Sequence, residues 1–295
     1  MQIAIASGKG GTGKTTVATN LAHVAAQNNR SVAYLDCDVE EPNGHIFLKP
    51  QITERRPVGR NIPNVDAQLC TLCGQCGQIC QYSAIVCVGQ QVLVHPDLCH
   101  SCGGCVLVCQ AGAITEVSHE IGHIETGQAG SLRFVHGLLD VGQAMSPPLI
   151  REVKRSAPQV ELILIDAPPG TSCPVIESIK DADYVLLATE PTPFGLNDLK
   201  LAVEMVRALR KPFGVIINRS DIGDGQVRHY CTSNRIAILA EIPHDRQLAE
   251  AYAQGIVASQ RFEPHRRLFT DLLTRIEQKT THNTGWQPAV RGGTQ

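Results

Sequence analysis

The sequence has no strong excess of charge of either sign and no long hydrophobic run. Its 295 residues carry 26 Lys or Arg and 28 Asp or Glu, which gives a formal net charge of −2. A nearly neutral chain does not favour a polyanion-binding surface, so we expect no nucleic-acid partner. No uninterrupted apolar stretch approaches the roughly 20 residues of a membrane-spanning helix, so we expect no membrane partner either.

We also expect no secretory signal peptide. A glycine-rich motif begins at Gly8, too close to the first residue for a cleaved signal peptide, and we expect a cytoplasmic protein. The chain nevertheless has 12 cysteines, most of them between Cys70 and Cys109. In a chain without export signals, clustered cysteines indicate metal ligands rather than disulfides.

The glycine-rich motif has the context of a phosphate-binding loop, because it follows the apolar residues 3–6 and precedes a helical pattern. Its glycines let the backbone wrap closely around an anion, and its amides point at the phosphates of a nucleotide. Lys14 would contact those phosphates, and the Thr15 hydroxyl would ligate Mg²⁺. A glycine turn without a ligand is the alternative. The predicted ATP-binding residues are Gly8, Lys9, Gly10, Gly11, Thr12, Gly13, Lys14, Thr15 and Thr16.

Acidic residues follow two predicted strands. Residues 31–35 lead into Asp36 and Asp38, and the apolar run 160–165 leads into Asp166. Ligands of parallel sheets bind at the carboxyl ends of the strands, so these carboxylates are expected near the phosphate-binding loop. The pattern supports metal binding there. For Asp36, a structural role is the alternative to metal binding.

Alternating strand and helix patterns before and after the cysteines predict one doubly wound, mostly parallel α/β domain that is interrupted by an insertion. Residues 51–66 have the composition of a connection that leaves the main domain. The expected divisions are 1–58 and 119–279 for the nucleotide-binding domain, 59–118 for the insertion, and 280–295 for a flexible tail. Later strands are expected at 184–188, 213–218 and 236–241, and helices at 197–209, 247–255 and 264–278.

The insertion contains one pattern twice, with cysteines spaced by two, two and three residues. The first copy is Cys70, Cys73, Cys76 and Cys80, and the second is Cys99, Cys102, Cys105 and Cys109. Paired zinc sites are the alternative, although zinc ligands usually form two well-separated C-x-x-C pairs. Cys87 lies between the copies on an apolar segment and is interpreted as a buried thiol.

The spacing resembles the run of bacterial ferredoxins, in which the fourth cysteine ligates the other cluster. This resemblance implies a small α+β ferredoxin-like domain with two [4Fe–4S] clusters. Cys70, Cys73, Cys76 and Cys109 would hold the first cluster, and Cys99, Cys102, Cys105 and Cys80 the second. The sequence departs from that pattern at Gln81 and Gln110, where ferredoxins usually have proline; this does not remove a ligand.

Roughly residues 1 to 275 resemble the P-loop ATPases of the MinD/Mrp superfamily, which includes the ParA proteins and the nitrogenase iron protein. The resemblance rests on the loop with an additional early lysine, on the segments at 36–38, 166–170, 189–195 and 215–219, and on the cysteine insertion. It implies that Lys9 reaches the nucleotide of a dimer partner. The alternative is that Lys9 is an ordinary solvated surface lysine. The resemblance also implies that Asp38 activates or orients the attacking water and that Asp166 holds Mg²⁺ through water. Asn218 and Pro243 would contact the adenine.

Three function classes compete on this evidence. The leading hypothesis is an ATPase whose nucleotide state (ATP or ADP) gates electron transfer from the clusters to a redox partner protein, as a homodimer or as a heterodimer with a paralogue. An ATP-dependent iron–sulfur cluster carrier is the alternative, but the late C-x-x-C pair of such carriers is missing here. A positioning ATPase such as MinD is disfavoured by the polar tail. Cys173 and Cys231 are interpreted as buried, inert thiols, with a further cluster between subunits as the alternative.

Overall fold

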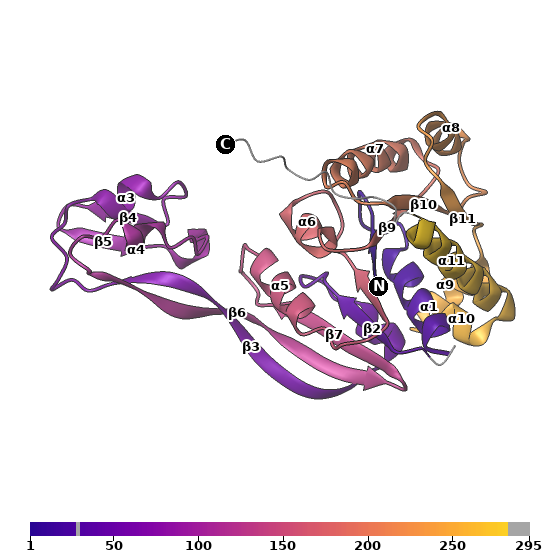
Figure 1. The fold of residues 1–295 in the computed structure, drawn as a ribbon, viewed down its shortest axis with the longest axis horizontal. Helices are drawn as coiled ribbons and strands as arrows, with labels where there is room; N and C mark the ends of the chain where they lie inside the picture. The colour runs from indigo at the N-terminus through magenta and orange to yellow at the C-terminus, as the bar shows by residue number, and fades with distance from the viewer. Residues whose placement is uncertain (28–29, 283–295) are drawn as a thin grey trace, which may run out of the picture.

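The computed structural model describes residues 1–27 and 30–282 of the chain. Figure 1 shows a main body with a layered sheet and, apart from it, a small module at the far end of a long two-stranded ribbon.

The main body is built on a nine-stranded sheet with the order β11-β10-β9-β1-β8-β2-β7-β6-β3. The strands from β11 to β7 are parallel, and β6 and β3 add an antiparallel edge. Residues on both faces of the central strands are apolar and buried, as a parallel sheet covered on both sides requires. The parallel strands are β1 (Gln2–Ala6), β2 (Val32–Asp36), β7 (Leu132–Leu139), β8 (Leu162–Asp166), β9 (Tyr184–Thr189), β10 (Phe213–Asn218) and β11 (Ile238–Ile242).

Helices cover both faces of this sheet, and each face has its own hydrophobic core. On one face lie α1 (Lys14–Gln27), α10 (Ala258–Arg261) and α11 (Glu263–His282); on the other lie α5 (Pro147–Arg155), α6 (Cys173–Ile179), α7 (Pro193–Ala208) and α8 (Gln226–Ser233). Two further helices of the main body are α2 (Gly44–Leu48) and α9 (Arg246–Ala253). The predicted doubly wound, mostly parallel fold is confirmed.

Two long strands, β3 (Gln51–Val65) and β6 (Ile114–Ala129), pair antiparallel along their whole length and form the ribbon to the module. The expected connection at residues 51–66 is thus largely a strand, β3, which leads from the main body to the module. The first half of β3 is solvent-exposed, so it lacks the alternation of apolar residues that identifies a strand. Its prolines are tolerated because β3 is an edge strand. The predicted domain divisions fall inside both strands and stay a prediction.

The module, residues 66–113, contains two short α-helices, a β-hairpin and a 3₁₀ turn. In chain order, these elements are α3 (Gln75–Ile79), the hairpin strands β4 (Ile85–Val88) and β5 (Gln91–Val94), the 3₁₀ turn η1 (Pro96–Leu98), and α4 (Gly104–Leu107). The sequence repeat is also a repeat of backbone conformation. Leu72 and Ser101 both have φ near +55°, and Gly74 and Gly103 both have φ above +70° where α3 and α4 begin. The two cysteine segments thus make the same left-handed turns, although the assignment as a ferredoxin domain stays a prediction.

The last described element, α11, extends to His282. Residues 280–282 are therefore helical, contrary to the prediction of a flexible tail, and the rest of the predicted tail lies outside the described residues. No helix in the described part of the chain is both long and apolar enough to cross a membrane.

Candidate functional site

The glycine-rich loop lies between β1 and α1, at the carboxyl edge of the sheet, and neighbouring elements pack tightly against it. A side chain at Gly8 would come within 2.3 Å of the backbone oxygen of Asp198 in α7. Gly13 has φ of +92°, and a Cβ there would lie 2.6 Å from Nδ2 of Asn218. Glycine is therefore required at Gly8 because of close contact, and at Gly13 also because L side chains rarely adopt its backbone conformation.

A cavity of about 450 Å³ opens beside this loop. The amide of Asn218 reaches into the loop and donates to the Thr12 carbonyl oxygen over 3.0 Å. The cavity collects most of the predicted nucleotide residues: Gly10, Gly11, Gly13, Lys14, Thr15, Thr16, Asp38, Asn218 and Pro243. Gly8, Lys9, Thr12 and Asp166 do not line it. The size and the polar lining suit a nucleotide, while the role of each residue stays a prediction.

The two strand-end aspartates lie opposite each other, Asp36 on β2 and Asp166 on β8. Asp36 is fully buried and accepts hydrogen bonds from the amides of Asp38 and Gly44, at 3.2 and 2.9 Å. These bonds close the β2–α2 loop, residues 37–43, which gives Asp36 a structural role. Asp166 accepts one hydrogen bond, from the Tyr34 hydroxyl at 2.9 Å, and its buried Oδ1 has no partner among the described residues.

Burial raises the pKa values of all three carboxyl groups at this edge of the sheet. Burial, reinforced by the charge of Asp166, holds the pKa of Asp36 well above its usual value. Burial also raises the pKa of Asp166, against the lowering effects of Thr15 and Lys14. At Asp38 burial raises the pKa to about 6, although Lys14 opposes this. A cation would relieve this crowding of negative charge, and the orphaned Oδ1 of Asp166 is a suitable acceptor for a metal-bound water.

Tyr34 is a site residue that the sequence analysis missed. Its ring stacks on Phe134 with 5.8 Å between centroids, and a side chain at Gly44 would collide with it at 2.4 Å. Its hydroxyl holds Asp166, as described above. The residue stands inside an apolar strand pattern, where a tyrosine usually signals only core packing, and so the sequence offered no signal for its role.

Lys9 lies at the surface beside the cavity rather than in it. Its side chain is 34% exposed, and its ammonium lies 4.0 Å from the carboxylate of Glu190, which also binds Arg219 at 2.9 Å. Lys9 therefore does not contact the nucleotide cavity of its own chain. The predicted contact with a partner's nucleotide stays a prediction.

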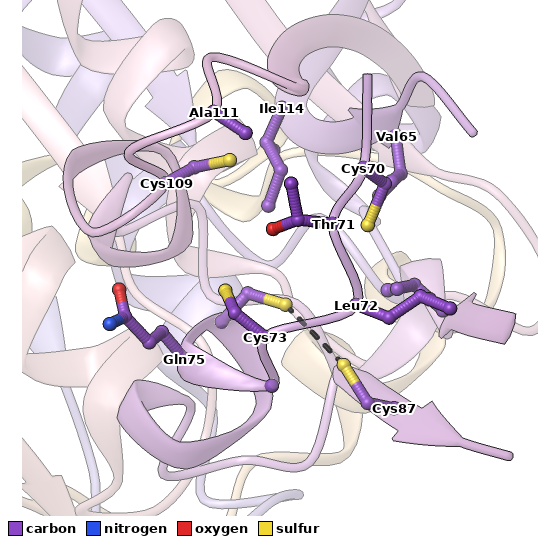
Figure 2. A pocket seen from close by; sticks show the side chains of 13 residues that line it. Val65, Cys70, Thr71, Leu72, Cys73, Gln75, Cys87, Cys109, Ala111 and Ile114 are labelled. Carbon is purple, nitrogen blue, oxygen red and sulfur yellow. Dashed lines mark hydrogen bonds between the residues drawn. The ribbon is translucent and has the colours of Figure 1, made fainter. Parts of the chain in front are cut away.

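Four cysteines from both copies of the repeat line one small cavity in the module: Cys70, Cys73, Cys76 and Cys109. Figure 2 shows the side chains of Cys70, Cys73 and Cys109 around it. Cys87 lines the same cavity, and its sulfur lies 3.8 Å from that of Cys76, marked by the dashed line in Figure 2. Cys87 is only half-buried, so the prediction of a buried thiol there is wrong; β4 carries it to the cavity wall.

In the other predicted ligand set, backbone amides point at two of the sulfurs. The amide of Ala84 donates to the Cys80 sulfur at 3.3 Å, and that of Ser101 to the Cys99 sulfur at 3.4 Å. Burial alone would raise the pKa of Cys80, but surrounding amides, Tyr82 first, lower it overall. Amides directed at sulfur stabilise thiolate, the form that binds metal.

In the described part of the chain, no three His, Cys, Asp or Glu side chains converge closely enough to hold a metal ion as they stand. The chemistry of the cysteine donors and their amide contacts nevertheless fit a metal–sulfur cluster. The two predicted cluster ligand sets stay predictions.

A chain of contacts connects the β2–α2 loop with the module. The carboxylate of Glu40 in this loop accepts a hydrogen bond from the buried Ser146 hydroxyl at 3.0 Å. The neighbouring Met145 contacts the guanidinium of Arg60 in β3 at 3.4 Å through its sulfur. Arg60 donates in turn to the backbone oxygens of Cys99 and Pro96 in the module. The nucleotide cavity and the cysteine module are thus joined by side chains as well as by the ribbon.

The two cysteines interpreted as buried, inert thiols differ from each other. Cys231 is buried on α8, and burial raises its pKa to about 11, as expected of an inert thiol. Cys173 is exposed at the start of α6, so the prediction that it is buried is wrong. The first buried residue of α6 is its third, Val175, and Cys173 at its start lies in solvent.

Comparisons with known proteins agree with the geometry of the main body. The model of the CobQ/CobB/MinD/ParA nucleotide binding domain matches residues 3–258. Two uncharacterised proteins of Methanocaldococcus jannaschii are 30% and 36% identical to the chain. They cover 86% and 76% of it, and the matches span 90% and 80% of their own lengths. An iron–sulfur cluster carrier protein of Pyrococcus horikoshii is 24% identical over 94% of this chain and 86% of its own. Among solved structures, the septum site-determining protein MinD of Pyrococcus horikoshii in complex with Mg-ADP has a TM-score of 0.59 at 20% identity, covering 97% of this chain and 99% of its own.

Proposed function

The chain belongs to the CobQ/CobB/MinD/ParA nucleotide-binding family, and from this premise we propose that it is a slow MgATPase with two resident [4Fe–4S] clusters. Its nucleotide state would gate electron transfer from these clusters to a partner protein. Family membership supports the ATPase activity in general; the clusters and the gating are the proposal.

For the ATPase half, the cavity residues have the chemistry that phosphoryl transfer needs. Lys14 would neutralise the phosphates, and Thr15 with Asp166 would hold Mg²⁺, directly and through water. Asp38 lines the cavity and would orient the attacking water. Asn218 at the end of β10 and Pro243 directly after β11 line it too and would contact the adenine.

For the module, the donor chemistry supports two four-cysteine ligand sets. Cys70, Cys73, Cys76 and Cys109 share one cavity although they come from both halves of the repeat, as interleaved ligation requires. Cys99, Cys102, Cys105 and Cys80 would form the other set. Such clusters supply one-electron redox chemistry, and the chain supplies the thiolates, the amide donors and the burial that set the potential.

The observation that carries the gating proposal is the chain of contacts from Glu40 through Ser146 and Met145 to Arg60. The β2–α2 loop holds Asp38 at the cavity, so binding of a γ-phosphate would shift this loop. A shift of Glu40 would move the β7–α5 loop, residues 140–146, against Arg60 and so change the surroundings of Cys99. A module inserted without function would not need these contacts.

The test of the proposal is metal analysis and nucleotide binding on anaerobically purified protein. We expect about eight irons and eight sulfides per chain together with MgATP binding in isothermal titration. The Cys73→Ala variant should lose iron and still bind MgATP, whereas Lys14→Ala should lose MgATP binding and keep its iron. Stoichiometric zinc in place of iron would contradict the cluster assignment.

An ATP-dependent cluster carrier is the second candidate, and the relative named as a carrier favours it. The two functions differ in whether the clusters leave the chain. A carrier would transfer iron and sulfide to an apo-ferredoxin when ATP is added, while a protein with resident clusters would keep its iron and transfer electrons only. Iron content of both proteins after separation distinguishes the two.

The functional unit in this proposal is a dimer, either of two copies or of one copy with a paralogue. Lys9 supports this, because its partly exposed side chain lies outside its own nucleotide cavity, with its ammonium 4.0 Å from Glu190. Closing a dimer over ATP would move Lys9 away from Glu190 to the partner's phosphates. The electron acceptor would be a separate redox partner protein.

A further inference from the structure

Arg60 is buried at the point where the ribbon meets the module. Only 4% of the residue is exposed. Its guanidinium donates to the Cys99 and Pro96 carbonyl oxygens, the latter at 2.8 Å, and contacts the Met145 sulfur at 3.4 Å. Its buried Nε has no partner within the described ranges 1–27 and 30–282.

The charge of Arg60 is not balanced by a nearby carboxylate. Within the described chain, no Asp or Glu lies within 4.0 Å of its guanidinium, whereas the nearby Arg55 and Arg56 pair with Glu125 and Glu152. Carbonyl oxygens satisfy hydrogen bonds but carry no net charge. A buried guanidinium without a counter-charge is strongly unfavourable, so its presence points to an anion that belongs at this place.

We propose that Arg60 is the counter-charge of the cluster held by Cys99, Cys102, Cys105 and Cys80, and that it raises the reduction potential of this cluster above that of the other. This inference rests on the proposed function. A cluster with four thiolates is net negative and gains a further negative charge on reduction, so a nearby cation favours the reduced form. The carbonyl that Arg60 binds and the ligating sulfur belong to one residue, Cys99, which places the charge beside this cluster.

The other predicted cluster has no such neighbour. The module from residue 66 to 113 contains no Lys or Arg, and none of the residues that line the cavity of Cys70, Cys73, Cys76 and Cys109 is basic. The two clusters would therefore be unequal despite the sequence repeat. Electrons would collect at the cluster on the Arg60 side, which also faces the β7–α5 loop and the ATPase half.

The test is a potentiometric EPR titration of anaerobically purified protein, compared among four forms. Arg60→Gln should lower the potential of one cluster and leave that of the other unchanged, and Arg60→Lys, which keeps the charge, should restore most of the shift. Arg55→Gln is the matched control, since it removes the same charge from the same strand at an exposed position, and should shift neither potential. Unchanged potentials in Arg60→Gln with full iron content would overturn the proposal.

If Arg60→Gln does not retain its clusters, the proposal is tested by asking which of the two clusters has the higher reduction potential in the protein with Arg60 intact. In Cys73→Ala the first cluster is lost, and the signal that remains should be the one with the higher potential; retention of the lower one would overturn the proposal. If the proposed function itself is wrong and the native protein contains no iron, none of these forms shows a cluster signal. This outcome is distinct from cluster signals with unchanged potentials.

Discussion

Removal of the Tyr34 hydroxyl tests whether this residue positions Asp166 for magnesium. In Tyr34→Phe the ring keeps its stacking on Phe134, and only the 2.9 Å hydrogen bond to the carboxylate is lost. A hydrogen bond to a charged acceptor contributes about 1.5–3 kcal/mol. Asp166 is 1% exposed and its Oδ1 already lacks a partner in the described chain, so no water replaces the lost donor easily.

Loss of this hydrogen bond should destabilise the state in which Asp166 is ionised and holds Mg²⁺. Burial raises the pKa of Asp166, and removal of the Tyr34 hydroxyl, which lowers that pKa, raises it further. The ionised form that binds magnesium is then less favourable. From the hydrogen-bond energy, the Mg²⁺ concentration for half-maximal ATPase activity should rise by about 10- to 100-fold at neutral pH.

The assay is steady-state ATP hydrolysis at fixed ATP over a range of free Mg²⁺, combined with thermal unfolding. Tyr184→Phe is the control, because this tyrosine is equally buried in the same sheet, on β9, away from Asp166. We expect the control to keep the wild-type magnesium dependence. A magnesium dependence of Tyr34→Phe that equals that of the wild type, in a folded protein, would refute the reasoning.

The remaining predictions concern the loop, the clusters and pH. Lys14→Ala should abolish MgATP binding in isothermal titration, because the phosphates lose their cation; unchanged affinity would contradict the assignment of the loop. Cys73→Ala and Cys109→Ala should lose the same cluster signal in EPR, since their sulfurs line one cavity although the repeat separates them; loss of different signals would count against interleaved ligation. Lys9→Ala should impair ATP-dependent dimerisation in light scattering and leave nucleotide binding by the monomer nearly intact. Because the pKa of Asp38 is raised to about 6, protonation below this pH should lower the hydrolysis rate by about tenfold per pH unit, and a rate independent of pH down to 5 would contradict a role of the carboxylate.

The main body was predictable from sequence because its signals are local. The apolar run before Asp166 is typical of a buried parallel strand, and the glycine pattern after residues 3–6 has one common structural context. Helix and strand positions after the insertion follow the predicted ranges within a few residues. Most of the predicted nucleotide residues come together in one cavity because the carboxyl ends of parallel strands meet at one edge.

The ribbon and its contacts were not predictable in the same way. The exposed half of β3 has no alternation of apolar residues, because its partner β6 and solvent, rather than a core, surround it. Arg60 has the same sequence character as its neighbours Arg55 and Arg56, and only the tertiary structure shows that it alone is buried at the module. Tyr34 was hidden for the opposite reason, since burial of an aromatic residue in a strand needs no function to explain it.

The claim that nucleotide state changes the clusters is tested most directly by their reduction potentials in three states of the wild-type protein. The potentials would be measured by EPR-monitored redox titration without nucleotide, with MgADP and with a non-hydrolysable MgATP analogue, after binding has been confirmed by titration calorimetry. The chain of contacts from Glu40 to Arg60 predicts that the potential of the Cys99 cluster differs between the ADP and ATP-analogue states, and by more than that of the other cluster. Identical potentials of both clusters in all three states would contradict the account.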